Sequence, residues 1–562
     1  MTNVTSSEMR RSGPLLATIL ALSLGLGLWA NQWGAPAQWH GDEMSTHARK
    51  LVEGRTLDTH HYSYGLLNYY VIALLVVVPD FIYDRAFDPR PRGAGARADS
   101  VWARRDQTRI MRGSRAVSAV QAMLLVAVTC WLGAMAFGVE AGLIAAALLA
   151  VDPELVTISH FATVDTGATL WYWVACALSF RYLIGGGGRW FLVAAFASGI
   201  AIGLKADRMA VVAPLLGSFV LARPRGRARD LLMPALLLPI GFAVANPLLV
   251  TAPFQYVDGF VRELWYNALR TPQMDFGRPL SYLRAGLGWP LVGLIVVAGG
   301  YGVARLWGKR SWATLIWIAL TFLPYGFLLG RTDKAWYAPM LFPPLLLLAA
   351  FGSTEWLREQ PRKVAAAGIA VMALVFAWSL YDSALVLGEF ANDARIRAGL
   401  WITDNAPVGS SILMAGYGPA LPLDRYQVRE PVRMDLCSDA AEPMLKLDNT
   451  PAYRKFRRSL LGLERWFGAH LGTPVRRQPY HAWFDAFTAK CEAPPSGEPD
   501  PDYVVIVGEG ETKEVSREQL VAHFKLVSHF EYPYGGLPGP PLGFVNLPVS
   551  VYQREPQRVL QH

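Results

Sequence analysis

Long apolar runs recur along this chain and restrict what it can fold into. A helix needs roughly 20 apolar residues to cross the hydrocarbon of a bilayer, and several of the runs reach that length. Charged residues make up only 17% of the 562 residues. The segments expected to span are residues 14–31, 116–136, 141–159, 166–184, 190–204, 209–222, 231–251, 286–304, 312–330, 336–353 and 364–385. The sequence therefore predicts a polytopic α-helical membrane protein with about 11 spans.

The apolar run at residues 64–83 has two interpretations. It either crosses the bilayer or lies as a helix against the membrane surface. The basic residues separate the two, because cytoplasmic loops are enriched in Lys and Arg. If this run does not cross, five basic clusters share the cytoplasmic side, at residues 10–11, 189, 223–229, 305–310 and 358–363. We therefore expect residues 64–83 to stay at the surface, although the basic stretch at residues 85–115 then lies outside.

Apolar density falls near residue 388, which divides the chain into two expected domains. Residues 1–387 form a transmembrane module, in which residues 32–115 are the first outer loop with its surface helices. Residues 388–562 form a soluble extracytoplasmic α/β domain. Its expected elements are a helix at 392–402 and strands at 411–414, 503–507 and 524–527. Cys437 and Cys491 would then face an oxidising compartment, and whether they pair stays open.

Charged residues at the ends of the apolar runs mark a candidate site. Carboxylates avoid hydrocarbon, so Asp42 and Glu43 must sit at the water boundary after the first run. The expected topology puts Asp165, the segment KADR at residues 205–208 and the segment RTDK at residues 331–334 on the same outer face. Charges that converge at one face of a membrane protein suggest a site.

Each of these segments also has a plainer interpretation. Asp42 and Glu43 could begin a solvated loop, and Asp165 could cap the helix that follows it. The segments 205–208 and 331–334 could be a charged turn and an ordinary loop. The aromatic residues Trp336 and Tyr337 could anchor the chain at the membrane interface. The sequence leaves these alternatives open.

Four motifs in a fixed order resemble a known family. They are the Asp42-Glu43 pair, the segment SHFATVD at residues 159–165, the segment GLK at 203–205 and the segment KAWYAP at 334–339, with Pro343 and Pro344 beyond. This order resembles the C-type glycosyltransferases, specifically the dolichyl-phosphate-mannose protein mannosyltransferase type and the related bacterial aminoarabinose transferases. The resemblance covers roughly residues 30–350 and implies an integral membrane enzyme, in the bacterial inner membrane, with its site outside the cytoplasm.

The resemblance also implies roles for particular residues. The family's first-loop acidic residue falls on Asp42, its neighbour on Glu43, and the second-loop acidic residue on Asp165. A carboxylate can take the proton of an acceptor hydroxyl, and cations can hold a leaving phosphate. The expected catalytic residues are therefore Asp42, Glu43 and Asp165. The expected substrate-binding residues are Lys205, Arg208, Arg331, Lys334 and Tyr337.

The implied reaction moves a sugar from a polyprenyl-phosphate donor to a hydroxyl acceptor on a lipid, a glycan or a protein. Membrane lipids are the remaining expected partners. The net charge of +9 does not indicate nucleic acid, since basic residues cluster between apolar runs. A divalent metal is possible at a carboxylate site, but the sequence defines no ligand set for it.

Two other classes of protein remain as alternatives. A transporter or flippase of lipid-linked sugars would also need charged groups at the membrane face. Transporters tend to show repeated halves with broken helices, and no such repeat is evident in this sequence. A non-catalytic assembly partner is the second alternative, and the intact acidic residues argue against it.

Overall fold

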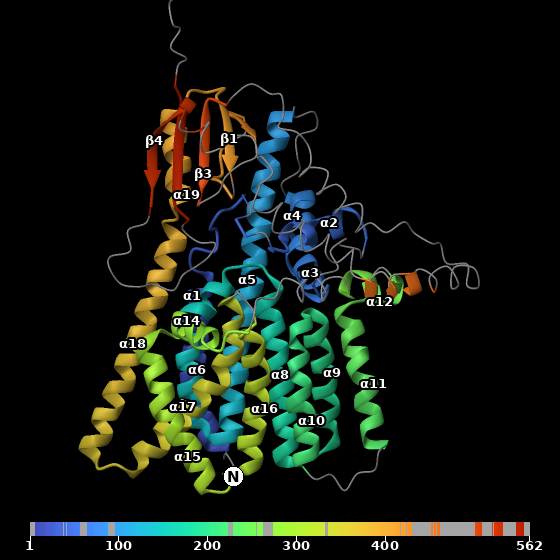
Figure 1. Ribbon diagram of the computed structural model, residues 1–562, viewed down its shortest axis with the longest axis vertical. Helices are drawn as coiled ribbons and strands as arrows, with labels where there is room; N and C mark the ends of the chain where they lie inside the picture. Colours follow the sequence, from blue (N-terminus) through green and yellow to red (C-terminus); the bar gives the residue numbers. More distant parts are fainter. Residues whose placement is uncertain are drawn as a thin grey trace, which may run out of the picture.

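A helical bundle carries a small mixed sheet at one end (Figure 1). The computed structural model describes residues 6–37, 39–40, 42–56, 64–87, 96–222, 229–254, 256–261, 274–331, 335–415, 417–422, 424–429, 501–508, 522–531 and 547–555, with a few residues at 451–463 and residue 520. We refer below to the end that bears the sheet as the sheet end. The N-terminal end of the bundle lies at the opposite end.

The bundle is built from apolar helices that bury one another's small and aromatic side chains. Its first half contains α1 (Ser6–Leu28), α5 (Ala96–Phe137), α6 (Val139–Ala150), α7 (Pro153–Ser159), α8 (Val164–Gly185), α9 (Gly188–Leu204), the 3-10 turn η2 (Ala206–Val211), α10 (Val212–Leu221), α11 (Arg229–Ala245) and α12 (Leu248–Thr251). Its second half contains α14 (Arg278–Leu294), η3 (Ile295–Gly299), α15 (Gly300–Gly308), α16 (Trp312–Leu329), η4 (Ala335–Leu341), α17 (Phe342–Glu359) and α18 (Arg362–Ala391).

Each expected span falls on one or more of these helices, which confirms the helical membrane class. Five described segments are long and apolar enough to cross a membrane by themselves: Asp106–Phe137, Arg278–Gly308, Trp312–Leu329, Tyr337–Glu359 and Arg362–Asn405. The pair α6 and α7, bent by 62°, would make a sixth. Several other helices are shorter, and the count of eleven spans stays a prediction.

Part of residues 32–115, the expected first outer loop, folds into short helices beside the upper part of α5. They are α2 (Ser45–Glu53), α3 (Leu67–Ile72), the π-helical η1 (Ala73–Val77) and α4 (Val78–Phe87), all at the sheet end (Figure 1). Tyr69 and Ile72 bury against Ile110 of α5, whereas Leu74 and Ile82 stay exposed. An exposed apolar face beside a buried one agrees with a surface helix. The position of residues 64–83 relative to the bilayer stays a prediction.

Described basic residues of two expected cytoplasmic clusters, 305–310 and 358–363, lie at the other end. Figure 1 places α15 and the link between α17 and α18 there. Arg305 pairs with Glu359 at 2.6 Å, and Arg358 pairs with Glu140 at 2.8 Å. Residues 223–228 of the third basic cluster lie outside the described part of the chain. The arrangement agrees with the expected sharing of one membrane side.

The C-terminal region forms a sheet with a helix against it, as the sequence predicts. The strands are β1 (Ser411–Ala415), β2 (Gln427–Arg429), β3 (Tyr503–Val507), β4 (Phe524–Phe530) and β5 (Val549–Arg554), in the order β2-β1-β3-β5-β4. β1 pairs in parallel with β2 and β3, whereas β5 pairs antiparallel with β3 and β4.

The helix α19 (Ala394–Asn405) packs on this sheet through Ala398 and Ile402, which bury against Ile412 and Val505. The three expected strands are therefore confirmed, and β2 and β5 are additions. The α18 helix continues to Ala391, so the domain boundary near residue 388 falls inside it and stays a prediction. Cys437 and Cys491 lie outside the described residues.

Candidate active site

Asp42 is exposed and lies in the loop between α1 (Ser6–Leu28) and α2 (Ser45–Glu53). Its backbone N–H donates to His40 Nδ1 at 3.2 Å, and the Tyr64 hydroxyl donates to Asp42 Oδ2 at 3.4 Å. His40 is buried against Phe161, and this burial lowers the pKa of its imidazole, although Asp42, Glu43 and Asp165 oppose the shift. A neutral imidazole can accept the Asp42 N–H, so the ring orients the segment that carries the carboxylate.

Glu43 lies in a different environment from its neighbour, because it is only 1% exposed. Arg115 of α5 donates from Nε to Glu43 Oε1 at 2.6 Å and from its second terminal nitrogen to Oε2 at 3.0 Å. The Ala162 N–H also donates to Oε1 at 3.3 Å, and the Met44 N–H donates to the Ala162 carbonyl at 2.8 Å. Glu43 therefore ties the first loop to α5 and to the turn before α8.

Arg115 also binds the backbone at the start of this loop. Besides Glu43, its guanidinium donates to the carbonyl of Asn31 at 3.0 Å and to the carbonyl of Trp33. Arg115 was not predicted as a site residue, because in the sequence it belongs to the basic stretch at residues 85–115. Arg115 immediately precedes the apolar run at residues 116–136, and a cation at the edge of such a run is a signal that a buried partner exists.

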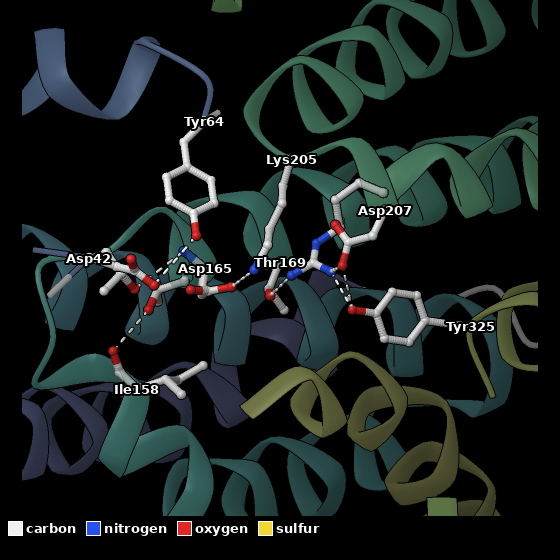
Figure 2. Close-up of polar contacts among 11 residues, drawn as sticks. Asp42, Tyr64, Ile158, Asp165, Thr169, Lys205, Asp207 and Tyr325 are labelled. Atoms are coloured by element: carbon white, nitrogen blue, oxygen red, sulfur yellow. Dashed lines mark hydrogen bonds and ion pairs between the residues drawn. The ribbon is translucent and has the colours of Figure 1, made fainter. Parts of the chain in front are cut away.

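Asp165 and Lys205 form a buried ion pair at the head of α8 (Figure 2). Lys205 is 7% exposed, and its ammonium lies 3.9 Å from the ring centre of Tyr337 and 5.9 Å from that of Tyr64. One interpretation of the sequence made Asp165 the cap of α8, and this interpretation is wrong. Thr163 is the N-cap, and its hydroxyl accepts the Asp165 N–H at 3.4 Å. The Asp165 side chain is thereby left to face Lys205.

Arg208 lies one turn further along and is 1% exposed. It donates to Asp207 at 2.7 Å, to Thr169 at 3.3 Å and to the Tyr325 hydroxyl, which itself donates to Asp207 at 3.0 Å. Figure 2 shows Thr169, Asp207 and Tyr325 beside the Asp165–Lys205 pair. Residues 205–208 are therefore not a solvated turn, because their two cations are buried and paired. Tyr325 was not found from the sequence, since a tyrosine in an apolar run gives no signal of its own.

The structure does not bring every expected phosphate ligand into this group. Arg331 follows the end of α16 and is exposed, and no hydrogen bond or ion pair joins its side chain to another described residue. Lys334 lies outside the described residues. Lys205, Arg208 and Tyr337 are the expected substrate-binding residues that meet at one place.

Backbone contacts fix the spacing of this group. The Gly65 N–H donates to the Leu204 carbonyl at 2.9 Å, and a Cβ at position 65 would lie 2.3 Å from the Gly203 oxygen. The buried Asn246 donates to the Gly203 carbonyl at 2.8 Å and accepts the Leu66 N–H at 3.4 Å. Tyr64 and Lys205 are thus held on two adjoining backbone segments. Asn246 is a further site residue that was not predicted from the sequence.

No cluster of three or more His, Cys, Asp or Glu side chains that could hold a metal ion occurs among the described residues. The carboxylates bind other side chains: Asp42 accepts a hydrogen bond from Tyr64, Glu43 pairs with Arg115, and Asp165 pairs with Lys205. The chemistry that these residues offer is proton acceptance at Asp42 and anion binding at Lys205.

A helical bundle with carboxylates and paired cations at one end, beneath an α/β sheet, agrees with the architecture that the resemblance to the C-type glycosyltransferases implies. Residues 108–251 match the dolichyl-phosphate-mannose-protein mannosyltransferase family model. The expected resemblance to the mannosyltransferase and aminoarabinose transferase type is thereby confirmed. The matched segment contains Arg115, Asp165, Lys205 and Arg208. A comparison with curated protein sequences finds no match.

Solved structures agree with this assignment of the fold. The chain is similar to ArnT from Cupriavidus metallidurans bound to undecaprenyl phosphate, with 13% identity and a TM-score of 0.51. It is also similar to ArnT from the same organism in the apo state, with 12% identity and a TM-score of 0.52. Each comparison covers 97% of this chain and 98% of the other. At these identities the likeness establishes the fold.

Proposed function

We propose that this chain is a glycosyltransferase that moves a sugar from a polyprenyl-phosphate donor to a hydroxyl acceptor at the sheet end of the bundle. We take this end to be extracytoplasmic, at a bacterial inner membrane. The proposal rests on one observation: Tyr64 contacts both an exposed carboxylate, Asp42, and a buried lysine, Lys205. The family match over residues 108–251 supports a transferase over a transporter or flippase.

Asp42 is the proposed general base. Its exposure gives an acceptor access, and no buried cation neutralises it in the described structure. The acceptor oxygen bonds to the anomeric carbon of the sugar as its proton passes to Asp42. The bond from that carbon to the phosphate oxygen breaks, and its electron pair leaves with the phosphate. A base on one face and a leaving group on the other resemble the arrangement of inverting hydrolysis.

Lys205 is the proposed direct contact to the donor phosphate. An ammonium carries three donors, and Asp165 takes one of them. Arg208 is more deeply buried, and Asp207, Thr169 and Tyr325 engage its terminal nitrogens. Its proposed role is therefore to hold positive charge below the phosphate, with Asp165 as the group that aligns Lys205.

Glu43 is proposed to position the site rather than to accept a proton. Both of its oxygens are engaged by Arg115, and its side chain is shielded from solvent. Glu43 is the neighbour of Asp42 and contacts Ala162, three positions before Asp165. It therefore links the two segments that carry the other carboxylates.

The test is undecaprenyl phosphate binding to purified, detergent-solubilised protein. We expect Lys205→Ala to weaken binding by about 10- to 150-fold, the equivalent of about 1.5–3 kcal/mol for a charged hydrogen bond. Lys309→Ala is the matched control, because Lys309 also pairs with a carboxylate, Glu355, but at the opposite end of the bundle. Arg331→Ala tests the remaining expected cation. Equal affinity of the parent and the Lys205 variant would refute the proposed phosphate site.

A further inference from the structure

Two tryptophans from the first outer loop are inserted between the bundle and the C-terminal region. Trp33 and Trp39 are each 2% exposed and pack edge to face, with 5.3 Å between their ring centres. Trp39 is separated from Asp42 by two residues, His40 and Gly41. A displacement of these rings therefore moves the segment that carries the proposed base.

The C-terminal region holds both tryptophans through specific hydrogen bonds. The Trp33 indole N–H donates to Asp393 Oδ2 at 2.9 Å. The Trp39 indole N–H donates to the Gly418 carbonyl at 2.7 Å. Asp393 is the N-cap of α19, and Gly418 follows β1. Loop residues and C-terminal residues far apart in the sequence are thus joined at two points.

A buried arginine completes this contact. Arg395 donates to both oxygens of Asp393, at 2.8 and 2.7 Å, and both side chains are fully buried. Its guanidinium carbon lies 4.1 Å from the ring centre of Trp39 and 5.1 Å from that of Trp33. Cation–π attraction is strongest where the cation is desolvated, as it is here. Arg395 therefore fixes the position of both rings relative to α19.

The contact continues on the other side to the proposed active site. Arg115, which binds Glu43, also donates to the Trp33 carbonyl, and its guanidinium lies 5.4 Å from the Trp33 ring centre. Trp33 is thus shared between Asp393 of the C-terminal region and Arg115 of the bundle. We propose that Trp33, Trp39, Asp393 and Arg395 are positioning residues, through which the C-terminal region holds the Asp42 loop in place.

This inference rests on the proposed function only for the role of Asp42, since the coupling itself is structural. The test is hydrogen–deuterium exchange of the purified full chain, in the absence of ligand. Trp33→Phe removes the N–H that Asp393 accepts but keeps an aromatic ring at the position. Trp39→Phe removes the N–H that Gly418 accepts. Trp317→Phe is the matched control, because its indole donates to Ser179 at 3.2 Å inside the bundle.

We expect the Glu43 and Met44 amides to exchange at least about tenfold faster in the Trp33 and Trp39 variants, in line with the loss of one buried hydrogen bond. These amides donate to the carbonyls of His40 and Ala162 in the parent. The Trp317 variant should leave their exchange unchanged. Unchanged exchange in both loop variants would overturn the inference. So would an equal increase across β1 and β3, because the tryptophans would then support the whole fold.

Undecaprenyl phosphate binding separates this inference from the proposed function. We expect the Trp33 and Trp39 variants to bind it within about twofold of the parent, because Lys205 and Arg208 lie on other elements. A parent protein that does not bind this lipid would overturn the proposed function. The hydrogen-exchange result would still test the coupling between the C-terminal region and the Asp42 loop. A variant that loses lipid binding together with its local protection would show that these residues support the phosphate site instead.

Discussion

Glu43 and Arg115 form a bidentate ion pair in which neither side chain is exposed to solvent. Removing one partner of such a pair leaves the other charge buried and uncompensated, which costs about 3–5 kcal/mol. We therefore expect Glu43→Gln to lower the unfolding temperature of the protein in detergent substantially. The control is Glu140→Gln, which breaks an exposed pair with Arg358 and should cost less than about 1 kcal/mol. Equal thermal stability of the two variants would contradict the positioning role of Glu43.

Asp42→Asn tests the proposed base without this structural cost. The substitution keeps the size of the side chain and its capacity to accept the Tyr64 hydrogen bond, but it removes the basicity. We expect sugar transfer from a polyprenyl-phosphate donor to fall by about 100-fold or more, with the unfolding temperature unchanged. The matched control is Asp404→Asn on the exposed side of α19. Parent-like turnover by a folded Asp42 variant would exclude Asp42 as the base.

The buried His40 predicts how the loop responds to pH. Burial lowers the pKa of His40 in the folded protein below its value in the unfolded chain. As the pH falls, His40 is therefore protonated in the unfolded chain before it is protonated in the folded protein. The contribution of neutral, buried His40 to the free energy of unfolding is fully present above the unfolded pKa near 6.5. It is lost as the pH drops from there toward the folded pKa. Protonation of Nδ1 would also break its hydrogen bond with the Asp42 N–H.

We therefore expect the amides of residues 42–44 to lose protection against hydrogen exchange as the pH falls below about 6.5, after correction for the intrinsic exchange rate. His40→Gln should remove this pH dependence, because the glutamine amide does not titrate. A parent loop whose corrected protection is constant over this range would contradict the prediction.

The orientation of the bundle can be tested by cysteine labelling in spheroplasts. Asp404→Cys on α19 lies at the sheet end, whereas Arg310→Cys follows α15 at the other end. Both sites are exposed, and Cys130 and Cys176 are buried. In a background with Cys437 and Cys491 replaced by serine, we expect an impermeant maleimide to label only the Asp404 variant. Labelling of the Arg310 variant alone would show that the topology is the reverse of the proposed one.

The helical class and the acidic part of the site could be predicted because both depend on local composition. Long apolar runs indicate membrane spans. Asp42, Asp165 and Lys205 could be recognised as candidate site residues because a charge at the end of such a run is costly. Short continuous runs of apolar residues likewise indicated β1 and β3. A three-residue strand such as β2 (Gln427–Arg429) carries too short a pattern to be recognised in this way.

The partners of these residues could not be predicted, because they depend on packing between distant segments. Trp33 and Asp393 are 360 positions apart, and Arg115 and Glu43 are 72 apart. The same limit explains the distinction between Asp42 and Glu43, which are adjacent in sequence and opposite in exposure. Only the folded chain separates the carboxylate that solvent reaches from the one that Arg115 covers.

The close approach of Gly65 to the backbone of Gly203 and Leu204 has a genetic consequence. A side chain at position 65 would meet main-chain atoms at 2.3 and 2.4 Å, so trimming a neighbouring side chain gives it no room. Only a shift of the turn that carries Lys205 would accommodate it. Second-site suppressors of a substitution at Gly65 should therefore be rare, and those that arise should map to the end of α9 or to η2, where they would restore the distance between the two backbones.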